Sequence, residues 1–365
     1  MSTENANNLS DGYNDPNTIV AEDFNPFISI IIPVYNGRQY IIKLLESIQN
    51  QIAFDLSTLE VILCDDNSTD NFMELIENND DINLNIHYCK TNPREHHCPG
   101  NTRMDGWHEA SGEWIMFVDQ DDELTNDALA LITKAIAENN ESHFVFTRFG
   151  EYYPDGKEIR HYGLTAITWL HGKAYNRKWL IEAGIDFKEN MMSHEDLYFN
   201  NQVVDALVGI DANYSTVDQE TYRWIYETES ASRKVSTGKY NYMELNVDDF
   251  VYAGTEVHIA YAENYPDKKM FYRQKMIVCL LHLYYYYEGM LCKNGEKDEM
   301  NDHMLDIIRN TIDKIATHFD CSKDDIIKEV YSSPKAAETL RQASIPGIGF
   351  FIERHSFVDF MRHVV

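Results

Sequence analysis

The stretch FISIIIPVYNGRQYIIKLLESIQ, residues 27–49, contains the first strand, turn and helix expected in the chain. Its first part is a continuous apolar run up to Pro33, which is typical of a strand buried on both faces. The letters YNGRQ then indicate a tight turn. Apolar residues follow at helical spacing: Ile41, Leu44, Leu45 and Ile48. Residues 27–49 therefore predict the opening strand-turn-helix unit of an α/β fold.

The same alternation of strand and helix continues beyond this unit. We expect strands at LEVILC (59–64), NIHYC (85–89), EWIMFVD (113–119) and HFVFTRF (143–149). We expect helices at FMELIENN (72–79), at PGNTRMDGWHEASGE (99–113) up to about Gly112, and after a cap at Asn126. Alternation of this kind predicts a parallel sheet, and ligands of such sheets bind at the carboxyl ends of the strands. Four aspartates follow those ends: Asp65, Asp66, Asp119 and Asp121.

The pattern changes after residue 150. YYPDGKEI (152–159) predicts a hairpin turn, and NRKWLIEA (176–183) predicts a short helix. SHEDLYFNNQVVDA (193–206) predicts a helix with a capping box, in which Ser193 is the N-cap and Asp196 lies three residues after it. Two extended segments, DANYSTVD and TYRWIYE, come next, and the chain is mostly helical from about Lys239.

The composition indicates a folded globular protein. Hydrophobic residues make up 44% and charged residues 25% of the 365 residues. The formal net charge is -29, so the long-range field repels nucleic acid and we expect no nucleic-acid partner. An anionic substrate would need a metal ion, backbone amides or placed arginines at its site. The six cysteines have no CxxC spacing, which favours reduced thiols over disulfides or a zinc site.

Three regions are expected along the chain. Residues 1–25 form a polar tail, expected to be disordered, without the features of a targeting peptide, so we expect a cytoplasmic protein. Residues 26–237 hold the α/β domain and residues 238–365 a mainly helical region. The most apolar window, MIVCLLHLYYYYEGMLC (276–292), is shorter than the ~20 apolar residues of a membrane span. We therefore expect no transmembrane segment.

The stretch FVDQDDEL (117–124) places carboxylates directly after a buried strand. Asp119 and Asp121 can both turn toward one divalent cation that prefers oxygen ligands, such as Mg²⁺ or Mn²⁺. A solvated acidic turn would give the same letters. An aspartyl-phosphate phosphatase would also begin with a strand and two such aspartates, with Asp119 as the nucleophile.

Two further constellations carry acceptors and carboxylates. VILCDDNSTDN (61–71) places Asp66 where its oxygens suit a nucleobase imide or ribose hydroxyls, and a plain Asx-turn is the alternative. His194-Glu195-Asp196 places two carboxylates at a helix start, where the helix dipole stabilises their charged forms. A carboxylate there is available as a proton acceptor, and a simple helix cap is the alternative.

Four ordered motifs together resemble the family 2 glycosyltransferases with the GT-A fold. They are SIIIPVYNGRQYIIKLLESIQNQ, EVILCDDNSTD, PGNTRMDGWHEASGEWIMFVDQDD and SHEDLYF, and the likeness covers roughly residues 27–235. The resemblance implies an α/β fold with a Rossmann-like mixed sheet, the nucleotide-diphospho-sugar transferase architecture, and a C-terminal helical appendage. It also implies a glycosyltransferase that uses a nucleotide-sugar donor, most often a UDP-sugar.

The resemblance also implies roles for individual residues. Pro33 and Tyr35 match positions that flank the nucleobase, Asp66 matches the aspartate that recognises the base, and Asn92 and Arg103 match donor-pocket positions. Asp119 and Asp121 match the DxD pair that holds Mn²⁺ or Mg²⁺, with Asp121 as the direct ligand and Asp122 as a turn residue.

For catalysis, Asp196 matches the general base, and Glu195 orients it. A single displacement at the sugar, with inversion, onto a hydroxyl of a glycan or glycopolymer is then expected. A catalytically silent binding or assembly protein on the same fold is the rival reading.

Several weaker candidates complete the set. Trp169, His171 and Lys173 could contact an acceptor, and Arg233 with Lys234 could close over the diphosphate. His96, His97 and Cys98 lack a second ligand pair at zinc spacing. The aromatic C-terminal helices could pack on the catalytic domain, on a polymer acceptor or on a second copy, giving a homo-oligomer.

Overall fold

A computed structural model describes residues 25–94, 97–227, 246–294 and 299–332. One mixed sheet of nine strands forms its centre, in the order β3-β2-β1-β4-β8-β6-β9-β5, with β7 paired to β6. The strands are β1 (Ile28–Val34), β2 (Leu59–Asp65), β3 (Ile86–Lys90), β4 (Trp114–Phe117), β5 (Glu123–Leu124), β6 (Phe144–Tyr152), β7 (Glu158–Tyr162), β8 (Lys173–Asn176) and β9 (Tyr214–Ile225).

The first half of the sheet is parallel, as its sequence predicts. β1 pairs in parallel with both β2 and β4, and β2 pairs in parallel with β3. β8 then runs antiparallel to β4 and to β6, so β6 points the same way as β4. Because β1, β2 and β4 are parallel neighbours, their carboxyl ends meet at one edge, which carries the aspartates.

Helices cover both faces of the sheet. They are α1 (Ile41–Gln49), α2 (Phe72–Glu77), α3 (Pro99–Glu109), α4 (Ala128–Glu138), α5 (Arg177–Ala183) and α6 (Glu195–Gly209). One core cluster joins α1, α2 and α4 to the sheet, and a second joins α3, α5 and α6 to its other face. Apolar residues recur every three or four positions in α1, and all four that the sequence singles out are buried.

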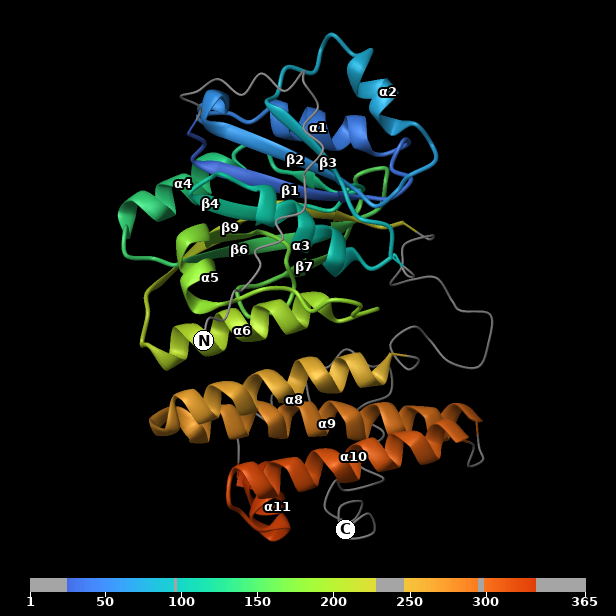
Figure 1. The fold of residues 1–365 in the computed structure, drawn as a ribbon, viewed down its shortest axis with the longest axis vertical. Coiled ribbons are helices and arrows are strands. Elements are labelled where there is room, and N and C mark those ends of the chain that lie inside the picture. The colour runs from blue at the N-terminus through green and yellow to red at the C-terminus, as the bar shows by residue number, and fades with distance from the viewer. Residues whose placement is uncertain (1–24, 95–96, 228–245, 295–298, 333–365) are drawn as a thin grey trace, which may run out of the picture.

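A helical bundle follows the sheet domain and lies beneath α6 (Figure 1). Its members are α8 (Val247–Asn264), α9 (Lys269–Asn294), α10 (Glu299–His318) and α11 (Lys323–Ser332). They share their own apolar core, and Leu197 of α6 packs against it. Among the described residues, no helix is both long and apolar enough to cross a membrane.

Two helix starts differ from the sequence prediction. α4 begins after Asp127 instead of Asn126, and no side-chain hydrogen bond caps that start. The capping box at Ser193 is also wrong, because α6 begins after His194, whose φ of 59° is left-handed. The Ser193 hydroxyl lies 2.8 Å from Nδ1 of His194 instead of reaching the helix. The two extended segments after residue 210 form the single strand β9, and the predicted hairpin joins β6 to β7.

Some sequence predictions lie outside the described residues. These concern the tail over residues 1–24, His96, Arg233, Lys234 and the aromatic C-terminal segment 347–365.

Candidate active site

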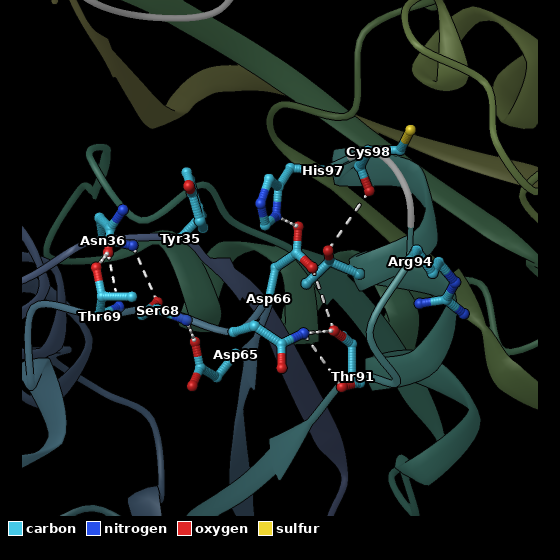
Figure 2. Close-up of polar contacts among 12 residues, drawn as sticks. Tyr35, Asn36, Asp65, Asp66, Ser68, Thr69, Thr91, Arg94, His97 and Cys98 are labelled. Carbon is cyan, nitrogen blue, oxygen red and sulfur yellow. Dashed lines mark hydrogen bonds and ion pairs between the residues drawn. The ribbon is translucent and has the colours of Figure 1, made fainter.

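The loops after β1 and β2 are tied together at the carboxyl edge of the sheet (Figure 2). The backbone N–H of Asn36 donates to Oγ of Ser68 at 2.9 Å, and the N–H of Thr69 donates to Oδ1 of Asn36 at 2.9 Å. Asn36 and Asn67 both have left-handed backbone, with φ of 51° and 59°, which asparagine adopts more readily than most residues. These turns bring two polar loops to one side of β1.

Asp65 and Asp66 have different surroundings. Asp65 accepts hydrogen bonds from the Ser68 N–H and the Tyr88 hydroxyl, both at 2.8 Å, so it holds its own loop. Asp66 accepts from Oγ1 of Thr91 at 3.2 Å through one oxygen, and its other oxygen lies 2.9 Å from Nδ1 of His97. Both carboxylates therefore contact residues outside the loop after β2, and Asp66 is the one that meets His97.

Tyr35 lies beside Asp66, with its ring stacked on His97 at a centroid distance of 4.1 Å. Its backbone makes a reciprocal pair of hydrogen bonds with the side-chain amide of Gln120, at 2.9 Å and 3.2 Å. Gln120 stands between Asp119 and Asp121, so this pair joins the Tyr35 loop to the turn after β4. Pro33 precedes this loop in β1, next to Cys64 of β2, and Asn92 is exposed after β3.

The turn after β4 holds three aspartates in different settings. The N–H of Asp122 donates to the carbonyl of Asp119 at 3.1 Å, which closes the turn as its sequence predicts. The Asp122 side chain, however, is only 2% exposed. It accepts from the Tyr222 hydroxyl at 2.5 Å and from the Ile225 N–H at 2.8 Å, so it attaches β9 to the turn. Burial, followed by the charges of Asp121 and Asp119, raises the pKa of Asp122 well above its usual range.

Arg103 of α3 joins the turn to the start of α6. It is 5% exposed. Nη2 donates to Oδ1 of Asp119 at 2.5 Å, and Nη1 donates to Oε1 of Glu195 at 2.8 Å. Burial alone would raise the pKa of Asp119, but the Arg103 and His171 side chains outweigh it, and that pKa lies below its usual range. The guanidinium of Arg103 therefore brings together three sequence motifs: its own in α3, the one that contains Asp119 and the one that contains Glu195.

Asp196 follows Glu195 in the first turn of α6 and is half-buried. Burial, and then the negative charge of Glu195, raises its pKa to about 7. A carboxylate with such a pKa is matched to proton transfer near neutral pH. A Cβ added at Gly100 would lie 2.9 Å from Cβ of Glu195, so α3 approaches this helix start closely at that glycine.

A group of possible metal ligands lies beside the turn. Asp119, Asp122 and His171 each offer a ligand atom, and these atoms lie within 4.8 Å of one another. Nε2 of His171 lies 3.8 Å from Oδ2 of Asp119 and 4.0 Å from Oδ2 of Asp122, and its Nδ1 is buried without a hydrogen-bond partner. Two carboxylates and one imidazole are a donor set that a divalent transition metal accepts. The residues therefore fit a cation, and the group differs from the predicted pair by containing Asp122 and His171 beside Asp119.

The other weaker candidates mainly serve packing. Trp169 packs against the core and contacts the rings of His171 and Trp224. Lys173 is buried and donates to the carbonyls of Ala166 and His171, and burial lowers its pKa to about 7. Lys173 is therefore closed off from an acceptor in this arrangement, whereas Trp169 is only partly buried.

The loop before α6 is held by the helical bundle. Oδ2 of Asp249, at the start of α8, accepts from the backbone N–H groups of Met192 at 2.8 Å and Ser193 at 3.0 Å. The ring of Phe250 packs edge-on against His194, whose pKa burial lowers to about 4. No spacing rule in the sequence connects Asp249 with Ser193, 56 positions away.

Residues 29–198 match the sequence model of the family described as Glycosyl transferase family 2. This domain belongs to glycosyl transferase family 2. The expected family membership is therefore confirmed for the part of the chain that contains all the motifs discussed above.

Two curated relatives show how far the likeness extends along longer proteins. The chain is 35% identical over 184 residues to the poly(ribitol-phosphate) beta-N-acetylglucosaminyltransferase TarS of Staphylococcus aureus, covering 47% of this chain and 31% of TarS. It is 36% identical over 107 residues to the GalNAc(5)-diNAcBac-PP-undecaprenol beta-1,3-glucosyltransferase of Campylobacter jejuni, covering 29% and 33%. The matches thus span about a third of the length of these relatives.

The fold has a close counterpart among solved structures. The crystal structure of S. aureus TarS 1–349 in complex with UDP-GlcNAc matches with a TM-score of 0.66 at 19% identity. The match covers 89% of this chain and 91% of that one, so the likeness extends beyond the family domain. The GT-A fold with a C-terminal helical region is therefore confirmed.

Proposed function

We propose that this family 2 domain is an inverting glycosyltransferase that moves a sugar from a UDP-sugar to a hydroxyl of a glycan or glycopolymer. The observation that carries the proposal is the meeting of three motifs at Arg103, which binds Asp119 and Glu195 beside the proton acceptor Asp196. In support, Tyr35 and Asp66 lie on the adjoining loops after β1 and β2, and Gln120 ties the Tyr35 loop to the same turn.

The donor base would bind at Asp66 and Tyr35. A uracil presents one imide N–H and two flat faces. The Asp66 carboxylate can accept a hydrogen bond from the N–H, and the Tyr35 ring can stack on one face. Pro33, Asn92 and Arg103 are proposed to complete the donor pocket. The TarS structure that shares this fold was solved with UDP-GlcNAc, which makes that compound the first donor to test.

The diphosphate would lie near the turn after β4. Asp119 and Asp121 are proposed as ligands of Mn²⁺ or Mg²⁺, with Asp122 and His171 as further candidates from their place beside Asp119. When bound, such a cation offsets the negative charge that develops on the departing nucleoside diphosphate. The protein is strongly acidic, so it offers little long-range attraction for that diphosphate.

Asp196 is the proposed general base. It would accept the proton of the acceptor hydroxyl while that oxygen forms a bond to the anomeric carbon and the bond to the diphosphate breaks. The pKa of about 7 supports this role, because the carboxylate then holds a proton well enough to act as a base and is largely ionised above neutral pH. Glu195 is proposed to orient its neighbour through the ion pair with Arg103.

The test is release of UDP from UDP-GlcNAc and a panel of other nucleotide-sugars with Mn²⁺, using poly(ribitol phosphate) and glycosaminoglycan oligosaccharides as acceptors. These acceptors follow from the names of TarS and of the Pasteurella multocida chondroitin synthase, which is 29% identical over 182 residues. We expect Asp196→Asn to bind donor and lose transfer, and Asp119→Asn to lose metal-dependent donor binding.

Asp218→Asn is the matched control, since Asp218 is an exposed carboxylate on β9 paired with Arg148. It should transfer sugar at the parent rate. Donor binding without turnover by any acceptor would favour a silent binding protein instead. Absence of both binding and turnover across the panel would overturn the proposal.

A further inference from the structure

His97 lies where the proposed donor base would lie. Its imidazole stacks on the Tyr35 ring, with a centroid distance of 4.1 Å and an interplanar angle of 29°. Its Nδ1 is 2.9 Å from Oδ2 of Asp66. Because a carboxylate can only accept, this ring nitrogen carries the proton and donates it. Figure 2 shows the imidazole between the two side chains, with the dashed bond to Asp66.

These two contacts are the ones a uracil would make. A flat heterocycle rests on an aromatic face, and a ring N–H points at a carboxylate oxygen. The second oxygen of Asp66 already accepts from Thr91, so Oδ2 is the oxygen left for a base. An imidazole and a base cannot hold the same face of Tyr35 and the same oxygen of Asp66 at once.

We propose that His97 is an internal occupant of the nucleobase subsite, which a donor base displaces, and that it sets the affinity and base selectivity of the donor site. The proposal rests on the proposed function, since it takes Asp66 and Tyr35 as the base-binding pair. A base must then outcompete the imidazole, which favours a nucleobase that offers both a stacking face and an N–H for Asp66.

The surroundings of the His97 side chain leave it room to rotate. Its side chain is 50% exposed. Two described residues near it in the chain have their own contacts: Cys98, the next residue, is buried directly before α3, and Arg94, three positions earlier, binds Asp105 through two hydrogen bonds. Rotation of the His97 side chain toward solvent would therefore expose Asp66 and Tyr35.

Displacement has a measurable consequence for affinity. When a site must first release an internal occupant, only the free fraction of the protein can bind the ligand. The apparent Kd is then the intrinsic Kd divided by that fraction. One aromatic stacking contact and one partly exposed hydrogen bond would together hold the subsite closed most of the time. Removing the imidazole should tighten binding of UDP by about tenfold.

The experiment is titration of UDP with Mn²⁺ into the full chain and into His97→Ala by calorimetry. His143→Ala is the matched control: His143 also stacks on an aromatic ring, Trp179, but precedes β6 at the opposite edge of the sheet. We expect a Kd about tenfold lower for His97→Ala and an unchanged Kd for His143→Ala. A Kd for His97→Ala that is unchanged or higher overturns the proposal, a higher value meaning that His97 holds the bound base.

A second measurement follows the imidazole itself. In the parent protein, the side-chain nitrogen resonance of His97, assigned by its loss in His97→Ala, should move to the position of a solvated histidine when UDP binds. A resonance that stays unchanged with UDP bound overturns displacement. If the parent binds UDP and His97 does not respond, the assignment of His97 alone fails. If UDP does not bind to the parent or the variant, the base-binding role of Asp66 and Tyr35 fails as well, and this proposal with it.

Discussion

Arg103 and Glu195 form a buried ion pair, with Nη1 2.8 Å from Oε1, that joins α3 to the first residue of α6. The same guanidinium binds Asp119 at the end of β4. A lysine carries one charged nitrogen and cannot bridge two carboxylates with the planar fork of arginine. Position 103 therefore requires an arginine, because a positive charge alone cannot bind both carboxylates.

Arg103→Lys should lower kcat by about a hundredfold, since Asp119 and Glu195 lose their common partner. Arg103→Met should also lower the free energy of unfolding by about 3–5 kcal/mol, because two carboxylates are left without their buried counter-charge. Steady-state kinetics and urea unfolding measure the two effects. Arg94→Lys, in the ion pair with Asp105, is the control, and a kcat for Arg103→Lys within twofold of the parent would contradict the bridging role.

The pH dependence of transfer should follow Asp196. Its pKa is raised to about 7, and a base must be ionised to accept a proton, so kcat/KM should fall as the pH drops below about 7 and level off above it. Glu195→Gln removes the neighbouring negative charge that helps raise this pKa. The acid limb of the profile should then move to lower pH. An acid limb that stays in place in Glu195→Gln would argue that another group titrates there.

Asp249 should act on catalysis from outside the family domain. Asp249→Ala removes the acceptor of the Met192 and Ser193 N–H groups, so we expect kcat to fall about tenfold with the Kd of UDP unchanged. Loss of charged hydrogen bonds should also cost about 1.5–3 kcal/mol of unfolding free energy. Asp249→Asn, whose amide oxygen still accepts, should recover part of both.

The neighbouring carboxylate supplies the control for this prediction. Asp248 is exposed and pairs with His303 on α10. Asp248→Ala should leave kcat near the parent value. Equal losses in both variants would point to a general effect of charge at the start of α8.

Much of the fold follows from local pattern in the sequence. The apolar runs at residues 28–34, 59–65 and 114–117 are long enough to be buried on both faces, and each becomes a central strand. Because parallel strands end at the same edge, the position of Asp66 and Asp119 on that edge also follows from order along the chain.

What the sequence could not supply is the pairing of side chains across long separations. Asp122 looks like an exposed turn residue, yet strand β9, a hundred positions away, buries it through Tyr222. His97 reads as a weak zinc candidate until the fold brings it to Asp66. Ser193 has the spacing of a helix cap, but Asp249 holds the backbone of its loop, and His194 starts the helix in a left-handed conformation instead.

The hydrogen bonds from the loop before α6 to Asp249 of α8 affect how this chain can be shortened or joined to parts of a relative. The predicted boundary near residue 237 leaves all the proposed catalytic carboxylates on one side and Asp249 on the other. A shortened protein that ends there would keep the proposed chemical groups but not the acceptor that fixes the backbone of Met192 and Ser193. Exchanging the helical bundle for that of a relative would therefore alter turnover unless the incoming first helix brings a carboxylate to the same two N–H groups.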